Sequence, residues 1–513
     1  MAKSESYYVR KKDLIKGKLH PYLARREFSY SECIIPNSKL TSFGIEEVNT
    51  STQFSRNIKL AIPLVSSPMD TVTESALAIG LALLGGIGVI HYNLNDGKEG
   101  NIEEKVRKSI PLQYKEAYNV KNFENGFLDN PITFSPEQHI SEIVRSGVST
   151  IPVTDNGKSH GRLLGIVTET DYSIKQHGHL QIKERMVSLK ELRKRHLVIE
   201  NSVLNASRNP LVTANNILLE NRGLALAVVD NYGNLVSLVT RTDIDKNEEY
   251  PYATKGSDKR LKVACAIEVT PDGMERIDAL RKIVDAFVID TAHGFTSIMK
   301  DMVRYCRKVC PDVDVIAGNI STAEAVEYFF KLGVDAIRIG TGPGSACKTI
   351  EVTGTGRAQG SAVWECAQTA KSLSKKYGKI YCIADGGAEN GGDCNKAIAL
   401  GADTVMFGRV FARANEAPGQ RSKDPVTGEP LKSYRGMGSE GAMNQGNASA
   451  RYSVHNSERR VAEGIEDKVS MMPLSEIVAE VIGGIRKGMF NAGCKNIPEM
   501  HKYARIYPLP PKK

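Results

Sequence analysis

Short apolar runs recur along the chain and alternate with longer segments whose apolar residues repeat at helical spacing. Eight runs predict buried strands, and most of them end in glycine or polar residues: 62–70, 85–91, 262–269, 286–294, 314–320, 336–344, 380–387 and 404–412. Segments such as 321–333 and 394–401 predict crossover helices that stop at glycine. This alternation predicts an α/β fold with a parallel sheet.

A (β/α)8 TIM barrel is favoured over a doubly wound sheet. Eight strands are predicted, and polar motifs follow many of them, as in barrels that assemble active sites at the carboxyl ends of their strands. No G-x-G-x-x-G motif follows a first strand and opens a helix, which argues against a Rossmann site.

The barrel pattern is interrupted after its second strand by an internal repeat. Gly161–Asp171 (GRLLGIVTETD) returns as Gly233–Asp243 (GNLVSLVTRTD), each copy after a β-like apolar stretch. The repeat resembles a tandem CBS pair, a module that often binds adenine nucleotides. The predicted domains are therefore 1–123 (first barrel part), 124–246 (CBS insertion) and 247–513 (second barrel part).

Composition limits the choice of partners. The 513 residues are 41% hydrophobic and 25% charged, enough for more than one ordinary domain. The net charge of +9 is dispersed, without a basic block interleaved with aromatics, so nucleic acid is an unlikely partner and small anions are better candidates. No apolar run approaches the ~18 residues of a membrane span, and nine scattered cysteines lack zinc-type spacing, so we expect a cytoplasmic protein without membrane association.

Three glycine-rich loops after the sixth, seventh and eighth strands are typical of a phosphate site. Glycine lets the backbone approach an anion closely and point N–H groups at it. The loops contribute Gly344 with Ser345, Gly386 with Gly387, and Gly408 with Arg409. Each glycine alone could simply complete a turn, but three such loops at one barrel face favour phosphate binding. Asp385, directly before the second loop, suits the hydroxyls of a ribose, so the expected ligand is a nucleoside monophosphate.

Cys347 lies within the first of these loops. Most cysteines in folded proteins are small buried hydrophobes, and we expect this of Cys265, Cys366 and Cys382. At the reactive face of a barrel, backbone dipoles can instead activate a thiol as a nucleophile. Such a thiol can add to an electron-poor purine carbon, and the adduct can lose hydride to a nicotinamide.

Six motifs together resemble the IMP dehydrogenase / GMP reductase family, and its IMP dehydrogenases in particular. In chain order they are SSPMDTVTE (66–74), DTAHG (290–294), AGN (317–319), GTGPGSACKT (340–349), ADGG (384–387) and YRGMGS (434–439). The resemblance covers nearly the whole chain, including the CBS pair. It implies NAD-dependent oxidation of IMP to XMP in guanine nucleotide biosynthesis, through a covalent cysteine–purine intermediate, by a homotetramer whose CBS pair takes adenine or guanine nucleotide effectors.

The resemblance also implies roles for individual residues. Cys347 would attack C2 of IMP. The substrate-binding set would be Ser67, Met69, Ser345, Asp385, Gly386, Gly387, Gly408, Arg409, Tyr434, Met437, Gly438 and Glu463. The nicotinamide half of NAD would face Asp290, Asn319 and Gly340. Potassium would be held by carbonyls of Gly342, Gly344 and Cys347.

Two positions depart from that family's pattern. Arg409 follows Gly408 where many relatives have serine, and Tyr92 stands where they have a second histidine. These changes bear on phosphate and adenine-side contacts.

The polar segment 443–464 separates a dehydrogenase from a reductase, because only the dehydrogenase must activate water. The resemblance matches Arg451 and Tyr452 in this segment to the Arg-Tyr pair of the dehydrogenases. Arg451 would be the general base, with Tyr452 assisting and Thr349 offering a second proton route. An exposed, permanently charged arginine is the alternative interpretation.

Three other functions remain open. A GMP reductase would share the barrel and cysteine loop and convert GMP to IMP with NADPH. An inactive, CBS-regulated nucleotide-binding protein would have lost the cysteine or the motif in segment 443–464, and both are intact in this sequence. A flavin-dependent barrel enzyme is a weaker candidate, because no residue set suggests flavin.

Overall fold

The computed structural model describes residues 19–24, 26–37, 39–95, 102–123, 127–128, 131–146, 148–207, 210–241, 249–256, 260–445, 448–451 and 461–509. Contacts divide the chain into two compact units. One lies within 1–121, 252–254 and 262–513, and the other within 122–251 and 255–261. Within the part described, no helix is both long and apolar enough to span a membrane.

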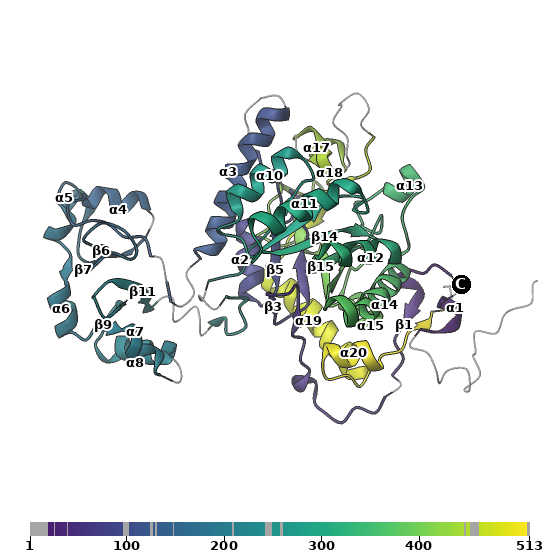
Figure 1. Ribbon diagram of the computed structural model, residues 1–513, viewed down its shortest axis with the longest axis horizontal. Helices are drawn as coiled ribbons and strands as arrows, with labels where there is room; N and C mark the ends of the chain where they lie inside the picture. The colour runs from purple at the N-terminus through teal and green to yellow at the C-terminus, as the bar shows by residue number, and fades with distance from the viewer. Residues whose placement is uncertain are drawn as a thin grey trace, which may run out of the picture. The chain divides into compact units, whose positions relative to one another are not determined.

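The larger unit is a closed barrel of eight parallel strands, which confirms the predicted (β/α)8 fold (Figure 1). Its strands are β4 (Leu64–Ser66), β5 (Ile87–Ile90), β12 (Ala264–Ile267), β13 (Ala286–Asp290), β14 (Asp314–Ile320), β15 (Ala336–Ile339), β16 (Tyr381–Asp385) and β17 (Thr404–Phe407). The smaller unit interrupts the barrel between β5 and β12, after the second strand as predicted. The last run is shorter than predicted, because Arg409–Ala412 form helix α16.

Alternate strand residues point into the barrel and fill it. Val65, Val89, Val288, Ile316 and Met406 belong to one fully buried cluster. The hairpin of β2 (Thr52–Gln53) and β3 (Lys59–Leu60) adds further apolar side chains to this cluster. The interior is therefore a packed core, and ligands must bind at its ends.

Helices surround the barrel, as the periodicity predicts. They are α2 (Ser75–Leu83), α3 (Ile102–Lys121), α10 (Pro271–Leu280), α11 (Ser297–Val309), α12 (Ala323–Leu332), α14 (Gln359–Tyr377), α15 (Gly391–Leu400) and α19 (Leu474–Asn491). Thr270, Thr296, Thr322 and Asn390 accept first-turn N–H groups of the helices that follow them. These caps satisfy donors that a helix start leaves unpaired, which fixes where each crossover helix begins.

Shorter elements extend the barrel. They are α1 (Pro21–Ala24), β1 (Cys33–Ile34), α13 (Thr349–Thr353), β18 (Arg421–Lys423), β19 (Pro430–Arg435), α17 (Glu440–Asn444), α18 (Ala448–Arg451), β20 (Glu466–Ser470), α20 (Ile497–Tyr503) and β21 (Tyr507–Pro508). Strands β18, β19 and β20 form an antiparallel sheet.

At the amino-terminal face of the barrel, aspartate side chains connect neighbouring strands by hydrogen bonds to the backbone. Asp285, Asp335 and Asp403 each stand one residue before a strand and accept a backbone N–H at the start of the preceding strand, at 2.8, 2.7 and 2.8 Å. Asp314, at the start of β14, accepts the N–H of Asn57 at 2.7 Å. A buried N–H left without a partner is costly, so these carboxylates fix the strand ends.

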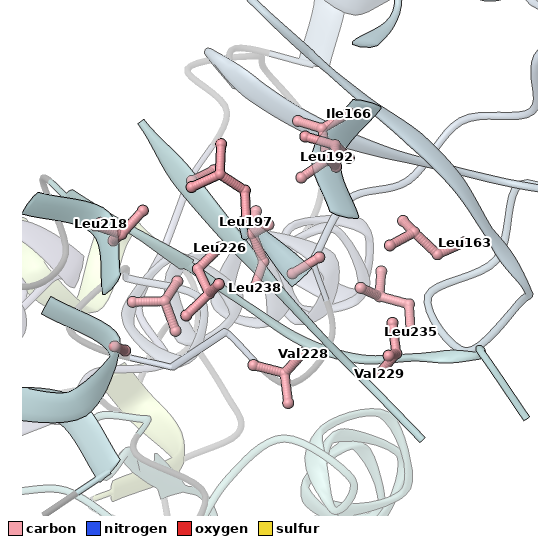
Figure 2. Packing of buried hydrophobic residues seen from close by; sticks show 14 of the residues in the cluster. Leu163, Ile166, Leu192, Leu197, Leu218, Leu226, Val228, Val229, Leu235 and Leu238 are labelled. Carbon is pink, nitrogen blue, oxygen red and sulfur yellow. The ribbon is translucent and has the colours of Figure 1, made fainter. Parts of the chain in front are cut away.

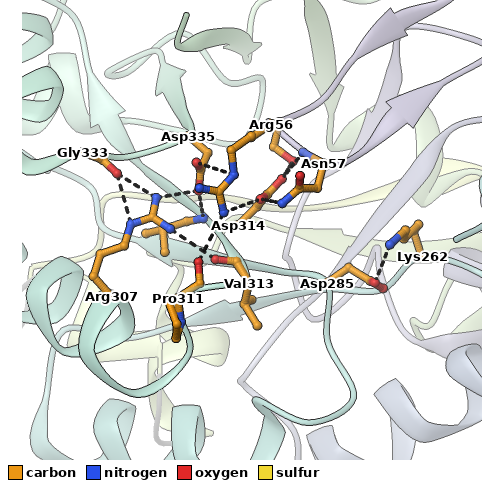
Figure 3. Close-up of polar contacts among 12 residues, drawn as sticks. Arg56, Asn57, Lys262, Asp285, Arg307, Pro311, Val313, Asp314, Gly333 and Asp335 are labelled. Atoms are coloured by element: carbon orange, nitrogen blue, oxygen red, sulfur yellow. Dashed lines mark hydrogen bonds and ion pairs between the residues drawn. The ribbon is translucent and has the colours of Figure 1, made fainter. Parts of the chain in front are cut away.

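Cations complete this face (Figure 3). Arg307 contacts Asp335 at 2.6 Å, and Arg56 lies 3.4 Å from both Asp314 and Asp335. Lys121 and Lys262 both pair with Asp285, at 3.0 and 2.8 Å. Lys121 directly precedes the smaller unit in the chain and Lys262 directly follows it, so the Asp285 carboxylate joins the two connections.

The smaller unit contains the repeat as two equivalent antiparallel hairpins. Its sheets are β6 (Thr150–Thr154), β7 (Leu163–Thr168) and β8 (Val187–Ser188), and β9 (Val198–Glu200), β10 (Ala225–Val229) and β11 (Leu235–Thr240). Its helices are α4 (Ile140–Ser146), α5 (Ile174–His177), α6 (Leu189–Lys194), α7 (Asn201–Asn205) and α8 (Pro210–Glu220).

The two copies bond to each other reciprocally. The N–H of Leu163 donates to the carbonyl of Gly233 at 3.1 Å, and the N–H of Leu235 donates to the carbonyl of Gly161 at 3.0 Å. A shared apolar cluster that includes Leu163, Leu226 and Leu238 packs the copies together (Figure 2). The repeat in the sequence therefore corresponds to a pseudo-symmetric pair.

Candidate active site

A cavity of about 560 Å³ opens at the carboxyl ends of the barrel strands. Most of the residues that the sequence assigned to the site line it: Ser67, Met69, Asn319, Gly340, Gly342, Gly344, Ser345, Cys347, Thr349, Asp385, Gly386, Gly387, Gly408, Arg409, Tyr434, Met437 and Arg451. Asp290, Gly438 and Glu463 lie behind this lining, and Tyr452 lies outside the described residues. Segments far apart in the chain thus meet where the barrel fold predicts.

The three glycine-rich loops that were predicted to bind phosphate meet beside Tyr434 in the cavity. The hydroxyls of Ser345 and Tyr434 lie 3.4 Å apart. A Cβ at Gly408 would meet the Met69 sulfur at 2.9 Å and the Tyr434 hydroxyl at 3.1 Å, so a larger residue there would displace the Met69 side chain. Burial raises the pKa of Tyr434, which keeps its hydroxyl a hydrogen-bond donor.

Arg409 lines the cavity next to Gly408. Its guanidinium pairs with Asp467 of β20 at 2.7 Å and lies 5.7 Å from the centre of the Tyr434 ring. The cation is therefore beside the loops and partly neutralised by Asp467.

Cys347 begins a short chain of hydrogen bonds. Its thiol donates to the Thr349 hydroxyl at 3.1 Å, and that hydroxyl donates to the Glu463 carboxylate at 2.8 Å. The backbone of Glu463 is held by the carbonyl of Gly438 and the N–H of Lys348. Glu463 can thus receive the thiol proton through Thr349. The sequence analysis placed Glu463 in the substrate-binding set and did not suggest this role.

Asp290 ends β13 and is fully buried. One of its oxygens accepts hydrogen bonds from both Arg338 and Arg451. Burial by itself would raise the pKa of Asp290, but the two guanidinium groups bring it below its usual value of 3.8. Asp290 is therefore a fixed negative charge beneath the cavity.

Arg338 organises the floor of the site and was missed in the sequence. It is fully buried within β15, donates to Asn319 and lies 3.4 Å from Asp385. Asn319 in turn donates to the Gly340 carbonyl at 2.6 Å and to Asp385 at 2.9 Å. An arginine inside the apolar run AIRI is the signal that could have identified it, since buried arginines need partners.

Arg451 ends α18, which lies against the end of β13. Its carbonyl accepts the N–H of Ala292 at 3.0 Å, while its side chain reaches Asp290. Arg451 therefore occupies the side of the cavity at which Asp290 and Asn319 were expected to face a nicotinamide.

The loop around Cys347, residues 340–349, has no acidic side chain, so it offers a cation backbone carbonyl and hydroxyl oxygens. Gly342 has a φ of +89°, and the Gly344 carbonyl accepts the Cys347 N–H at 2.9 Å. Among the described residues, no group of three or more His, Cys, Asp or Glu side chains could hold a metal. Carbonyl oxygens suit potassium, so the predicted set of Gly342, Gly344 and Cys347 is chemically compatible with it.

This combination of fold and site defines a class: a TIM-barrel protein that places a partly exposed cysteine among glycine-rich loops at the carboxyl ends of its strands. Comparison with known proteins agrees. Residues 27–509 match the family described as IMP dehydrogenase / GMP reductase domain. The chain belongs to that family and is an oxidoreductase.

Relatives named inosine-5′-monophosphate dehydrogenase resemble the chain along most of its length. Inosine-5′-monophosphate dehydrogenase of Chlorobaculum parvum is 38% identical over 474 residues, 90% of this chain and 89% of the relative. The Toxoplasma gondii protein of the same name is 33% identical over 535 residues, 92% and 91% of the two chains. Among solved structures, a cysteine-to-alanine variant of Trypanosoma brucei GMP reductase with guanosine 5′-monophosphate has a TM-score of 0.78 and 32% identity, covering 95% and 96% of the two chains.

Proposed function

We propose that this protein oxidises IMP to XMP with NAD⁺, in guanine nucleotide biosynthesis. The observation that carries the proposal is the chain from Cys347 through Thr349 to Glu463, placed beside three phosphate-type loops and facing Arg451. The 38% identity to dehydrogenases over 90% of the chain supports the same reaction.

Binding is the task of the loops and the ribose carboxylate. Backbone N–H groups near Ser345, Gly387 and Gly408 would hold the phosphate, and Asp385 would accept the ribose hydroxyls. Met69 and Met437 line the cavity where the base would lie. The phosphate contacts would then place C2 of the purine at the Cys347 sulfur.

The first chemical step forms a bond between Cys347 and the purine. The thiol proton moves through Thr349 to Glu463, and the sulfur adds to C2 of IMP. Asn319 and Asp290 would hold NAD⁺ beside C2, and the dinucleotide would supply the acceptor for the hydride that leaves C2. The thioimidate that remains joins Cys347 to the purine.

The second step is hydrolysis. Water adds to C2, the bond from carbon to sulfur breaks, and XMP and one proton leave. Arg451 would take a proton from this water. In the arrangement seen here Asp290 stabilises the charged form of Arg451, so that role requires Arg451 to leave the ion pair. Thr349 and Glu463 supply a second route that needs no such rearrangement, once Glu463 has released to solvent the proton that it took from the thiol.

GMP reductase activity is the second candidate, supported by the Trypanosoma brucei structures. One assay separates the two: the protein is mixed with IMP, NAD⁺ and potassium, and NADH absorbance is followed, with GMP and NADPH in a parallel reaction. We expect NADH from IMP in the first reaction. Conversion of GMP to IMP without IMP oxidation would reverse the assignment.

We also infer three finer properties. The smaller unit would be a CBS pair that binds adenine or guanine nucleotides, supported by its paired hairpins, and the carbonyls near Cys347 would bind potassium. A homotetramer would be the working assembly. The related Trypanosoma brucei GMP reductase has been crystallised with guanosine 5′-triphosphate, at 30% identity and a TM-score of 0.70, covering 94% of this chain and 98% of the relative. Titration of GTP, ATP and potassium against the NADH rate, together with light scattering, tests all three.

A further inference from the structure

We propose that Tyr92 is the positioning residue for Asp290. It sets the affinity for the nicotinamide dinucleotide and does not affect the affinity for the substrate nucleotide, IMP. This inference rests on the proposed function. Tyr92 follows β5 and is fully buried inside the barrel. Its hydroxyl donates a long hydrogen bond of 3.5 Å to Asp290.

Tyr92 and the arginines use different oxygens of Asp290. Arg338 and Arg451 both contact Oδ1, whereas Tyr92 contacts Oδ2. Arg451 must withdraw if a dinucleotide is to reach this side of the cavity. Asp290 then keeps Arg338 on one oxygen and Tyr92 on the other. The hydroxyl is thus the contact that orients the carboxylate when the dinucleotide binds.

The tyrosine remains a donor over the working pH range. Burial, followed by the negative charge of Asp290, holds the pKa of Tyr92 well above its usual value of 10. A separation of 3.5 Å is long for a hydrogen bond between oxygens, so a small shift of the Asp290 carboxylate toward Tyr92 would strengthen this contact.

A second buried ion pair holds the tyrosine ring. The guanidinium of Arg276 lies 5.8 Å from the ring centre. It forms a two-point contact with Glu268, at 2.9 and 3.0 Å, and both side chains are almost entirely buried. An arginine bound at two points has little freedom to move, so it gives the ring a rigid support.

Helix α3 completes this support. Gln113 accepts from Arg276 at 3.1 Å, and Ser109 accepts from it at 2.9 Å. The side-chain amide of Gln113 also donates to the carbonyls of Ile90 and Ala266, at 3.1 and 2.9 Å. Ile90 ends β5 two residues before Tyr92. The helix therefore fixes both the strand end that carries Tyr92 and the cation beneath its ring.

The matched variants are Tyr92→Phe, Tyr92→His and Tyr305→Phe. Tyr92→Phe removes only the hydroxyl, and Tyr92→His restores an N–H donor. Tyr305→Phe is the control, because the Tyr305 hydroxyl also bonds an aspartate, Asp278 at 2.7 Å, but on the outer helices. Thermal unfolding of each variant identifies any general loss of stability.

For Tyr92→Phe we expect the KM for NAD⁺ to rise about tenfold, as for a lost hydrogen bond to a charged group, with the KM for IMP unchanged. Tyr92→His should recover part of the loss, and Tyr305→Phe should match the wild type. An unchanged KM for NAD⁺, or an equal rise in both KM values, would overturn the inference. If the wild type instead reduces GMP, the same comparison is made with NADPH and GMP, so failure of the proposed reaction leaves this test intact.

Discussion

The two faces of the barrel use the same residue types for opposite purposes. At the amino-terminal face, Asp285, Asp335 and Asp403 accept backbone N–H groups of neighbouring strands and pair with cations. At the carboxyl-terminal face, Asp290 and Asp385 contact side chains that also line the cavity. Carboxylates that satisfy the backbone stabilise the fold, whereas carboxylates that contact side chains of the cavity lining are available for function.

The pKa values of two buried aspartates, Asp314 at the amino-terminal face and Asp290 at the carboxyl-terminal face, illustrate the difference between the two faces. Burial raises the pKa of Asp314, and hydrogen bonds from Ser55 and Asn57 only partly offset it. At Asp290 the effect of burial is outweighed by two arginines, and its pKa is lowered. The site therefore keeps a stable negative charge where a cationic nicotinamide would approach.

Loss of the thiol should have the largest effect and should leave the fold intact. Cys347→Ala is expected to reduce turnover by about 10³-fold or more, because the covalent step is removed, while the phosphate loops still bind IMP. Steady-state kinetics and calorimetry with IMP measure the two quantities. Cys366→Ala, at a buried cysteine outside the cavity, is the control. Retained turnover in Cys347→Ala would exclude the thiol from the mechanism.

Arg451→Ala should separate the two chemical steps. We expect a rapid burst of one NADH per site and then hydrolysis slowed by about 10²–10⁴-fold, as for loss of a general base. Stopped-flow absorbance measures both phases, and raising the pH should partly restore turnover.

Loss of the burst itself would give Arg451 a different role. Arg451 and Asp290 would then serve dinucleotide binding, and the base would have to be Glu463 through Thr349. Arg421→Ala, which changes an arginine of β18 outside the cavity, controls for the loss of a positive charge.

Substitutions at the amino-terminal face of the barrel should lower the free energy of unfolding and leave catalysis unchanged. Asp335→Ala removes the partner of Arg307 and of the Val315 N–H, so we expect a loss of about 3 kcal/mol in unfolding free energy. The KM values of the remaining folded enzyme should be unchanged. Asp278→Ala, in an exposed pair with Arg281, should cost less than about 1 kcal/mol. A changed KM with unchanged stability would contradict the division between the faces.

Removal of the smaller unit should have the least effect on basal activity. Lys121 and Lys262 meet at Asp285, so a short linker in place of residues 124–246 should close the barrel without strain. We expect kcat and KM within about threefold of the full chain, since the residues assigned to the site lie outside the smaller unit. Any response to ATP or GTP should disappear. A folded but inactive barrel would show that the insertion takes part in catalysis.

Much of the fold could be predicted because each strand of a parallel barrel appears in the sequence as an apolar run followed by polar residues. The eight runs and the interruption after the second strand are confirmed. The aspartates before Ala286, Ala336 and Thr404 were visible in the sequence, but their function depends on which backbone N–H lies opposite. That is set by strand register, which apolar patterning alone does not specify.

At the site, the sequence indicated which loops lie together but not which side chains contact one another. The glycine loops and Cys347 follow strands whose ends must converge. Arg338 and Glu463 contact residues that are far from them in the chain. The periodicity of the sequence cannot identify such pairs. Tyr92 was expected to bear on adenine-side contacts, but the structure buries it in the barrel beside Asp290.

The most direct test of the central claim is the mass of the peptide that contains Cys347 after a rapid acid quench. Wild-type protein is mixed with IMP and NAD⁺ for less than one turnover, quenched, digested and analysed by mass spectrometry. We expect the oxidised purine nucleotide on Cys347, in larger amount for Arg451→Ala and absent from Cys347→Ala. NADH formation with no adduct, or an adduct on another cysteine, would contradict the mechanism.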